Sequence, residues 1–122
     1  MATVEVKYEG GVALLILREQ NILGDDSCRV IEKEVFKLIK MGWLKILIDF
    51  ADVKFFKGED LLPTLIALHR EIKKIGGMLI LCNICPETQA YQVFRITQLD
   101  KFFTIVKDVE EAFSLFPTSE KP

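Results

Sequence analysis

The chain has 122 residues, half of which are hydrophobic, and its 16 basic and 18 acidic side chains give a formal net charge of −2. This length suits a single folded domain, and this hydrophobic content argues against intrinsic disorder. Because the two charge signs are balanced, the composition gives no support for a nucleic-acid partner.

Two further properties of the sequence bear on its location. No apolar run reaches the ~20 residues that a membrane-spanning helix needs, and the N-terminal residues lack the basic-then-apolar pattern of a signal peptide. The three cysteines are an odd number and are more typical of reduced thiols than of a disulfide framework. We therefore expect a cytoplasmic protein without direct insertion into a membrane.

The N-terminal third of the sequence predicts a hairpin followed by a helix. Residues 3–8 alternate apolar and polar side chains, and a Gly-Gly pair separates them from the continuous apolar run at residues 12–17. This pattern favours an antiparallel hairpin. A helix should then run to about Met41, and its first N–H groups could be capped by Asp25, Asp26 or Ser27.

The central stretch, residues 44–75, predicts a buried strand followed by an amphipathic helix. The strand is the apolar run at residues 46–48, which Asp49 ends. A polar segment at residues 54–60 leads into a helix with one broad apolar face, formed by Leu61, Leu62, Leu65, Ile66, Leu68, Ile72 and Ile75. Because ligands and partners usually dock beyond the carboxyl ends of parallel strands, residues 57–60 are the first candidate site.

The remaining sequence repeats the alternation of strand and helix. Residues 78–82 and 104–106 read as strands, Pro86 should begin a short helix with Ala90, Val93, Phe94 and Ile96 inward, and Asp108 should cap a last helix that ends at Phe116. The order ββαβαβαβα predicts an α/β fold with a mixed, mostly parallel sheet. We expect one domain over residues 1–116 and a disordered tail at residues 117–122.

This arrangement resembles the STAS domain, a family that includes bacterial anti-sigma factor antagonists and the cytoplasmic tails of sulphate transporters. The similarity is strongest from Lys45 to Val106. Residues 46–53 resemble the family's strand and its exit segment, residues 67–77 the end of its second helix, and residues 81–87 its next strand and turn. The resemblance implies the SpoIIAA-like α/β fold, with an N-terminal antiparallel hairpin and about four helices.

Residues 55–62 occupy the place of the family's signature loop. In the family this loop usually reads Asp-Ser-Ser-Gly, and a partner kinase phosphorylates a serine there, so that the added charge breaks the complex. The equivalent residues here are Lys57, Gly58, Glu59 and Asp60, and neither serine is present. We therefore expect no phosphorylation switch at these four positions.

Glu59 has two functional interpretations and a structural one. A fixed carboxylate there would hold the protein in a state like the phosphorylated, non-binding one, or the loop would bind a different partner through Phe55, Phe56, Lys57, Glu59 and Leu62. The structural interpretation is that Glu59 and Asp60 stabilise the first turn of a helix by ~0.3–1 kcal/mol, as acidic residues do at helix N-termini. The sequence leaves these alternatives open.

The resemblance implies a non-enzymatic protein-binding module in partner-switching control of transcription or signalling. Its expected partner is an anti-sigma factor with serine kinase activity. The alternative is an accessory subunit of a lipid or anion transporter, whose ATPase would dock on an exposed apolar patch formed by Phe55, Phe56 and Leu62. The sequence fixes no oligomeric state.

A rival from another class is a thiol redox protein that uses Cys82 and Cys85. The pair forms a Cys-x-x-Cys motif before the helix expected at Pro86, and a helix N-terminus stabilises a thiolate. Cys82 also continues a buried strand, where cysteine acts as a small hydrophobe. The single histidine, His69, and the lack of nucleotide-binding or hydrolase motifs predict no metal, cofactor or catalytic site.

Overall fold

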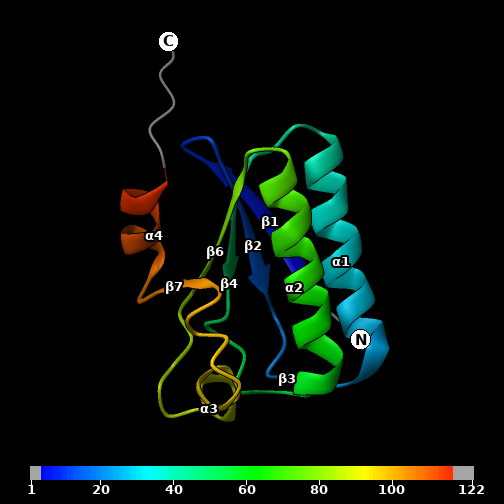
Figure 1. The fold of residues 1–122 in the computed structure, drawn as a ribbon, viewed down its shortest axis with the longest axis vertical. Coiled ribbons are helices and arrows are strands. Elements are labelled where there is room, and N and C mark those ends of the chain that lie inside the picture. The colour runs from blue at the N-terminus through cyan, green and yellow to red at the C-terminus, as the bar shows by residue number, and fades with distance from the viewer. Residues whose placement is uncertain (1–3, 117–122) are drawn as a thin grey trace.

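The computed structural model describes residues 4–116, so residues 1–3 and the tail expected at residues 117–122 lie outside the described residues. A five-stranded sheet with the order β1-β2-β4-β6-β7 forms its centre (Figure 1). These strands are β1 (Val4–Glu9), β2 (Val12–Leu17), β4 (Lys45–Asp49), β6 (Met78–Cys82) and β7 (Thr104–Val106). Strands β1 and β2 form the antiparallel hairpin, and all other neighbours are parallel, which confirms the expected mixed α/β fold.

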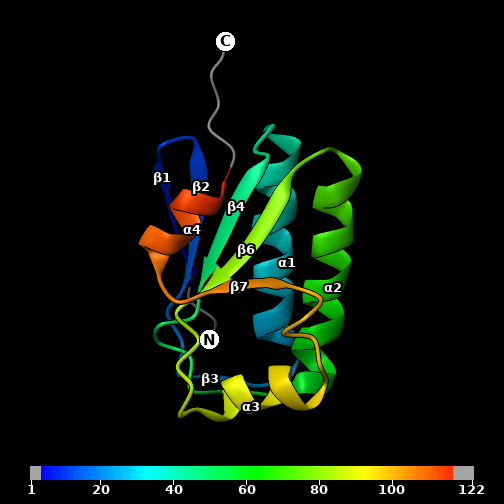
Figure 2. The same cartoon turned by 60° about the vertical axis from the view of Figure 1, so that its left-hand side comes forward.

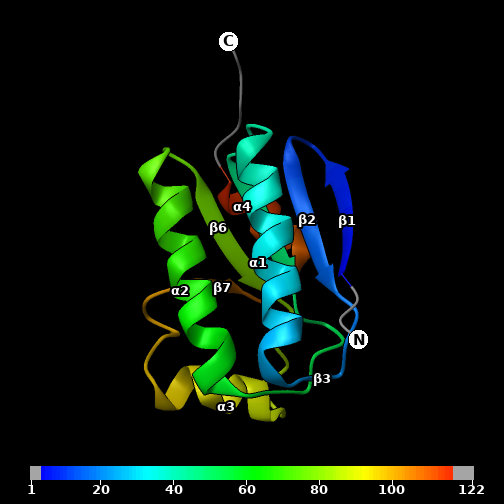
Figure 3. The same ribbon diagram turned by 90° about the vertical axis from the view of Figure 1, so that its right-hand side faces the viewer.

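Three helices cover the two faces of the sheet. Helices α1 (Gly24–Lys40) and α2 (Gly58–Lys74) lie side by side on one face, as Figure 3 shows. The shorter α4 (Val109–Leu115) covers the opposite face. Helix α3 (Gln89–Ile96) lies on neither face but beyond the carboxyl ends of the parallel strands, below the sheet in Figure 2.

The sheet separates two apolar cores. Ile46 and Ile48 of β4 belong to the larger core under α1 and α2, whereas Leu47 between them belongs to the smaller core under α4. All three side chains are 0% exposed. Successive residues of a strand point to opposite faces, so a strand that is covered on both sides needs the continuous apolar run seen in the sequence.

Two helices begin at residues other than the expected ones. Helix α1 starts at Gly24 with Leu23 as its N-cap residue, so Asp25, Asp26 and Ser27 lie in its first turn and are not caps. Helix α3 starts at Gln89 and not at Pro86, because the Thr88 hydroxyl accepts a hydrogen bond from the Tyr91 N–H at 3.2 Å and caps the helix there. The prediction that Ile96 points inward from α3 is wrong, because its side chain is 78% exposed. The prediction that Asp108 caps α4 is confirmed.

A second, very small sheet was not predicted from the sequence. Strands β3 (Asn21–Ile22) and β5 (Phe55–Phe56) pair in parallel at the carboxyl end of the main sheet. The pairing continues on either side, because the N–H groups of Lys54 and Phe55 donate to the Gln20 carbonyl, and the Lys57 N–H donates to the Ile22 carbonyl. This ladder fixes the path of the backbone into α2.

Candidate functional site

The candidate site is the first turn of α2, residues 57–60, which we call the α2 corner. Lys57 and Glu59 are exposed, and Gly58 and Asp60 are half-buried. Lys57 is the N-cap residue and has extended backbone angles, but its side chain accepts no hydrogen bond from the helix. The corner therefore presents one cation and two carboxylates beside N–H groups that carry the positive end of the helix dipole.

The backbone of the α2 corner has a further polar feature. Pro63 lies inside α2 and has no N–H, so the Glu59 carbonyl receives no hydrogen bond from the residue four positions later. The Thr64 hydroxyl donates to the Asp60 carbonyl at 3.4 Å. Thr64 is half-buried and engaged with the helix backbone, whereas Lys57 and Glu59 are the exposed residues of the corner.

The expected apolar patch at Phe55, Phe56 and Leu62 does not form. Phe56 is 0% exposed and Leu62 is 8% exposed, and only Phe55, at 36%, reaches the surface. Phe56 is buried because its ring packs edge-on against that of Phe94, with 5.5 Å between the centroids, and also against Phe50. The prediction that Phe56 and Leu62 are exposed for partner binding is therefore wrong.

Helix α3 holds the segment that enters the α2 corner. The Gln89 side chain accepts a hydrogen bond from the Phe56 N–H at 3.1 Å and donates one to the Phe56 carbonyl at 3.1 Å. The Ala90 N–H donates to the Lys54 carbonyl at 3.2 Å. A Cβ added to Gly58 would lie 3.2 Å from the Val93 side chain, so α3 also packs closely under the corner. No local sequence signal indicates these contacts.

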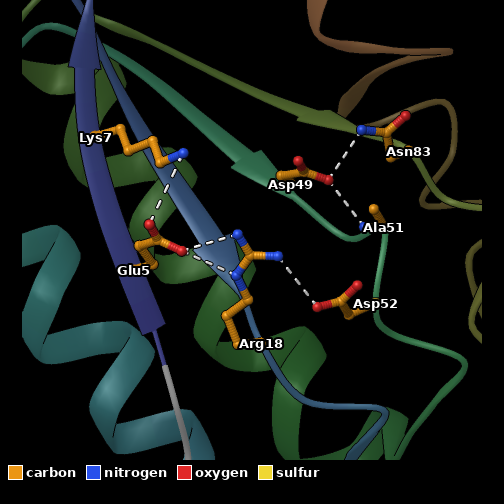
Figure 4. A network of polar contacts seen from close by, with 7 residues as sticks. All are labelled: Glu5, Lys7, Arg18, Asp49, Ala51, Asp52 and Asn83. Atoms are coloured by element: carbon orange, nitrogen blue, oxygen red, sulfur yellow. Dashed lines mark hydrogen bonds and ion pairs between the residues drawn. The ribbon is translucent and has the colours of Figure 1, made fainter.

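A polar network ties the start of β1 to the segments that follow β2 and β4, as Figure 4 shows. The Arg18 guanidinium donates to Glu5 of β1 at 2.9 Å and reaches Asp52, after β4, at 3.5 Å. The hydrogen bond to Glu5 raises the pKa of Arg18 above its ordinary value. Because these side chains are well exposed, the ion pairs contribute little to the stability of the fold and mainly orient the loop after β4 that carries Asp52.

Asp49, the last residue of the central strand β4, connects the ends of two neighbouring strands through hydrogen bonds. Its side chain is almost buried, and its Oδ1 accepts hydrogen bonds from the Ala51 N–H at 2.8 Å and the Asn83 amide at 3.0 Å (Figure 4). Asn83 follows β6 and has a φ of +61°, a region that asparagine tolerates better than most residues. This pair joins the ends of β4 and β6 just before the loops at the candidate site.

The two cysteines of the Cys-x-x-Cys motif have different surroundings. Cys82 is 0% exposed in the sheet, and its burial raises the pKa of its thiol to about 12. Cys85 is exposed, donates to the Glu87 carboxylate at 3.4 Å, and lies four residues before the start of α3. Neither thiol therefore has the helix N-terminus that the redox hypothesis requires, and a raised pKa lowers the thiolate fraction.

His69 is a half-buried residue of α2, and its ring packs against those of Phe102 and Phe103 at centroid distances of 4.8 and 5.6 Å. Its Nδ1 is buried without a hydrogen-bond partner in the described part of the chain, and burial, followed by nearby Lys73, lowers its pKa. Within residues 4–116, no cluster of histidine, cysteine and carboxylate side chains could hold a metal ion. In the same range, no helix is long and apolar enough to cross a membrane.

The fold places the chain in a class of small α/β domains whose mixed sheet begins with an antiparallel hairpin. The sequence profile of the STAS domain family matches residues 4–112, so the chain belongs to the STAS domain family. No curated protein sequence matches the chain.

Solved structures agree with this family. An anti-sigma factor antagonist from Mycobacterium paratuberculosis has a TM-score of 0.80 at 20% identity, with 95% of this chain and 94% of that one covered. A STAS domain protein from Planctomyces limnophilus has a TM-score of 0.77 at 21% identity, with 93% and 97% covered. The murine anion transporter Slc26a9 has a TM-score of 0.68 at 16% identity, with 88% of this chain and 18% of the transporter covered. At these identities, the likeness concerns the fold alone.

Proposed function

We propose that this protein is a non-enzymatic binding module of the anti-sigma factor antagonist kind, which acts in the cytoplasm and docks on a protein partner through the α2 corner. The observation that carries the proposal is the exposure of Lys57 and Glu59 at the start of α2 in a chain of the STAS family. The expected partner class is an anti-sigma factor with serine kinase activity.

The chemistry of the corner supports a docking role without catalysis. Lys57 and Glu59 offer charges of both signs, and the Glu59 carbonyl lacks its usual helical donor because of Pro63. These groups interact most favourably with a partner surface that carries complementary charges and a hydrogen-bond donor. Such complementarity sets the orientation and the specificity of binding. The hydrogen bonds from Gln89 and Ala90 hold the incoming backbone in place, so little ordering would be needed on binding.

The corner also has no hydroxyl group for a kinase to phosphorylate. Glu59 supplies a permanent single charge at the start of the helix, where a phosphate would add up to about two. The proposed docking at the corner therefore works without a phosphorylation switch at residues 57–60. The competing role of Glu59, stabilising the first helical turn, predicts a change in stability and no change in partner binding.

A role in a transporter complex is the second candidate, because the chain resembles one part of the Slc26a9 anion transporter in fold. The apolar docking patch expected for such a subunit does not form, since Phe56 and Leu62 are buried. Of the three residues, Phe55 alone remains as an exposed apolar contact. The partner itself therefore distinguishes the two candidates.

The test is affinity capture from cells of the source organism with the wild-type chain and with Glu59→Gln. Glu110→Gln is the matched control, because Glu110 is the second residue of α4 as Glu59 is of α2, and both are exposed. We expect an ATP-binding anti-sigma protein to be captured equally by the wild type and the control. Its affinity for Glu59→Gln, measured with the purified partner, should differ by about fivefold or more.

Two outcomes would contradict the proposal. Equal affinity of the wild type and Glu59→Gln for the partner would remove the α2 corner as the docking surface. Capture of a transporter ATPase in place of an anti-sigma protein would favour the second candidate. A Glu59→Ser variant adds a third measurement, because transfer of phosphate to it by the captured kinase would show that the kinase recognises the corner.

A further inference from the structure

A pocket of about 480 Å³ lies beyond the carboxyl ends of β6 and β7. We call it the carboxyl-edge pocket. It exists because α3 does not pack on a face of the sheet: the chain leaves β6, passes below the strands to α3 and returns to β7 (Figure 2). Pockets that bind small molecules usually measure ~300–1,000 Å³, so the space is large enough for a ligand.

The walls of the carboxyl-edge pocket are mostly apolar. Ile84 and Pro86 come from the loop after β6, Tyr91 from α3, and Ile105 from β7. A smaller hollow of about 210 Å³ shares the Ile84, Tyr91 and Ile105 side chains and extends the apolar surface toward Phe94. Together they form a surface suited to an alkyl chain rather than to a sugar or a peptide backbone.

The polar side chains that line the pocket include those of Asn83, Cys85 and Lys107. Lys107, directly after β7, is exposed, and no carboxylate of residues 4–116 lies within ion-pair distance of its ammonium group. Glu111 accepts a hydrogen bond from the backbone N–H of Lys107 and not from the ammonium. The other charged residues of the lining are Arg95 and Asp100, which both line the smaller hollow and balance each other in sign. The charges of the lining residues therefore sum to +1, while the Glu87 and Glu111 carboxylates, which contact Cys85 and the Lys107 backbone, stand just outside the lining.

We propose that the carboxyl-edge pocket binds a small amphiphilic carboxylate of medium chain length. Its alkyl chain lies against Tyr91, Ile84 and Ile105, and its carboxylate accepts a charge-assisted hydrogen bond from Lys107. The site is separate from the α2 corner and does not depend on the proposed function. Helix α3 belongs to both regions, since Tyr91 lines the pocket and Gln89 holds Phe56, so an occupied pocket can influence the corner through one rigid element.

Cys85 provides a reporter for occupancy. It lines the pocket and is exposed, whereas the other two cysteines, Cys28 and Cys82, are buried. The experiment measures the rate at which neutral iodoacetamide alkylates Cys85, with sodium octanoate, octanol or octylamine added at increasing concentration. We expect octanoate to slow alkylation in a saturable manner and to shift the backbone NMR signals of Tyr91 and Lys107, and the two other probes to bind more weakly.

The variant Lys107→Gln tests the charged contact, and Lys40→Gln at the far end of α1 is its matched control. Losing one ion pair should raise the half-protecting octanoate concentration about fivefold in Lys107→Gln and leave it unchanged in the control. Equal protection by octanol and octanoate would overturn the proposal. So would the absence of both protection and NMR shifts. Either result would leave partner capture through the α2 corner unaffected.

Discussion

The Gln89 side chain satisfies both backbone hydrogen-bonding groups of Phe56, 33 residues earlier in the chain. Within residues 4–116, β5 pairs with β3 on one side and with no strand on the other, and the Gln89 side chain takes the place of a neighbouring strand there. Phe56 in turn buries its ring against Phe50 and Phe94. One side chain at the start of α3 therefore fixes the segment that leads directly into the α2 corner.

We predict that Gln89→Ala lowers the free energy of unfolding by ~1–3 kcal/mol, because it leaves the N–H and the carbonyl of Phe56 without partners in a half-buried place. Urea denaturation measures the loss, and hydrogen exchange at the Phe56 amide should become faster. Gln92→Ala is the control, since Gln92 is exposed on the same helix. Equal stability of the two variants would show that water replaces the Gln89 contacts at no cost.

The regular elements of the fold were predictable from the sequence for a physical reason. Residues 46–48 and 78–82 are apolar on every position because both faces of the sheet are covered, and α2 shows its buried face at helical spacing. The Asp108 cap was also predictable, because a side-chain oxygen at that position satisfies a nearby N–H of the same helix. Local interactions leave a local signal in the sequence.

The candidate site was predictable in its position but not in its structure. Residues 57–60 lie at the exposed start of α2 as expected, yet Phe56 reads as exposed because the Phe55-Phe56 pair stands in a polar segment between Lys54 and Lys57. Its burial depends on Phe94 and Gln89, which lie more than thirty residues away in sequence and show no pairing pattern. The two-residue strands β3 and β5 are likewise too short to produce a periodic signal.

The N-terminus of α2 lacks a side-chain cap, and this predicts a stabilising substitution. Lys57 has the extended conformation of an N-cap residue, with φ −81° and ψ 112°, but lysine cannot accept a hydrogen bond from the first turn. Lys57→Asp should therefore raise the free energy of unfolding by ~0.5–2 kcal/mol. Lys54→Asp makes the same charge change at an exposed position that is not a cap, and it should give no comparable gain.

The cysteine environments predict selective alkylation. Burial raises the pKa of Cys82 to about 12 and that of Cys28 to about 11, so both thiols are protonated and shielded at pH 8. Iodoacetamide should modify Cys85 alone in the folded protein, and all three cysteines after unfolding in urea, as peptide mass spectrometry would show. Rapid labelling of Cys82, or rapid formation of a Cys82–Cys85 disulfide with oxidised glutathione, would revive the redox hypothesis.

The position of His69 predicts an acid-sensitive contribution to stability. Burial and Lys73 lower its pKa in the folded protein below the ordinary value of 6.5. Between the two pKa values, the unfolded chain binds more protons than the folded one, so the free energy of unfolding falls as the pH drops below about 6.5. His69→Gln removes this titration without adding a charge. The melting temperature of His69→Gln minus that of the wild type should therefore increase as the pH is lowered from 8 to 5. A difference that stays constant over this range would mean that the His69 ring is protonated equally in the folded and the unfolded chain.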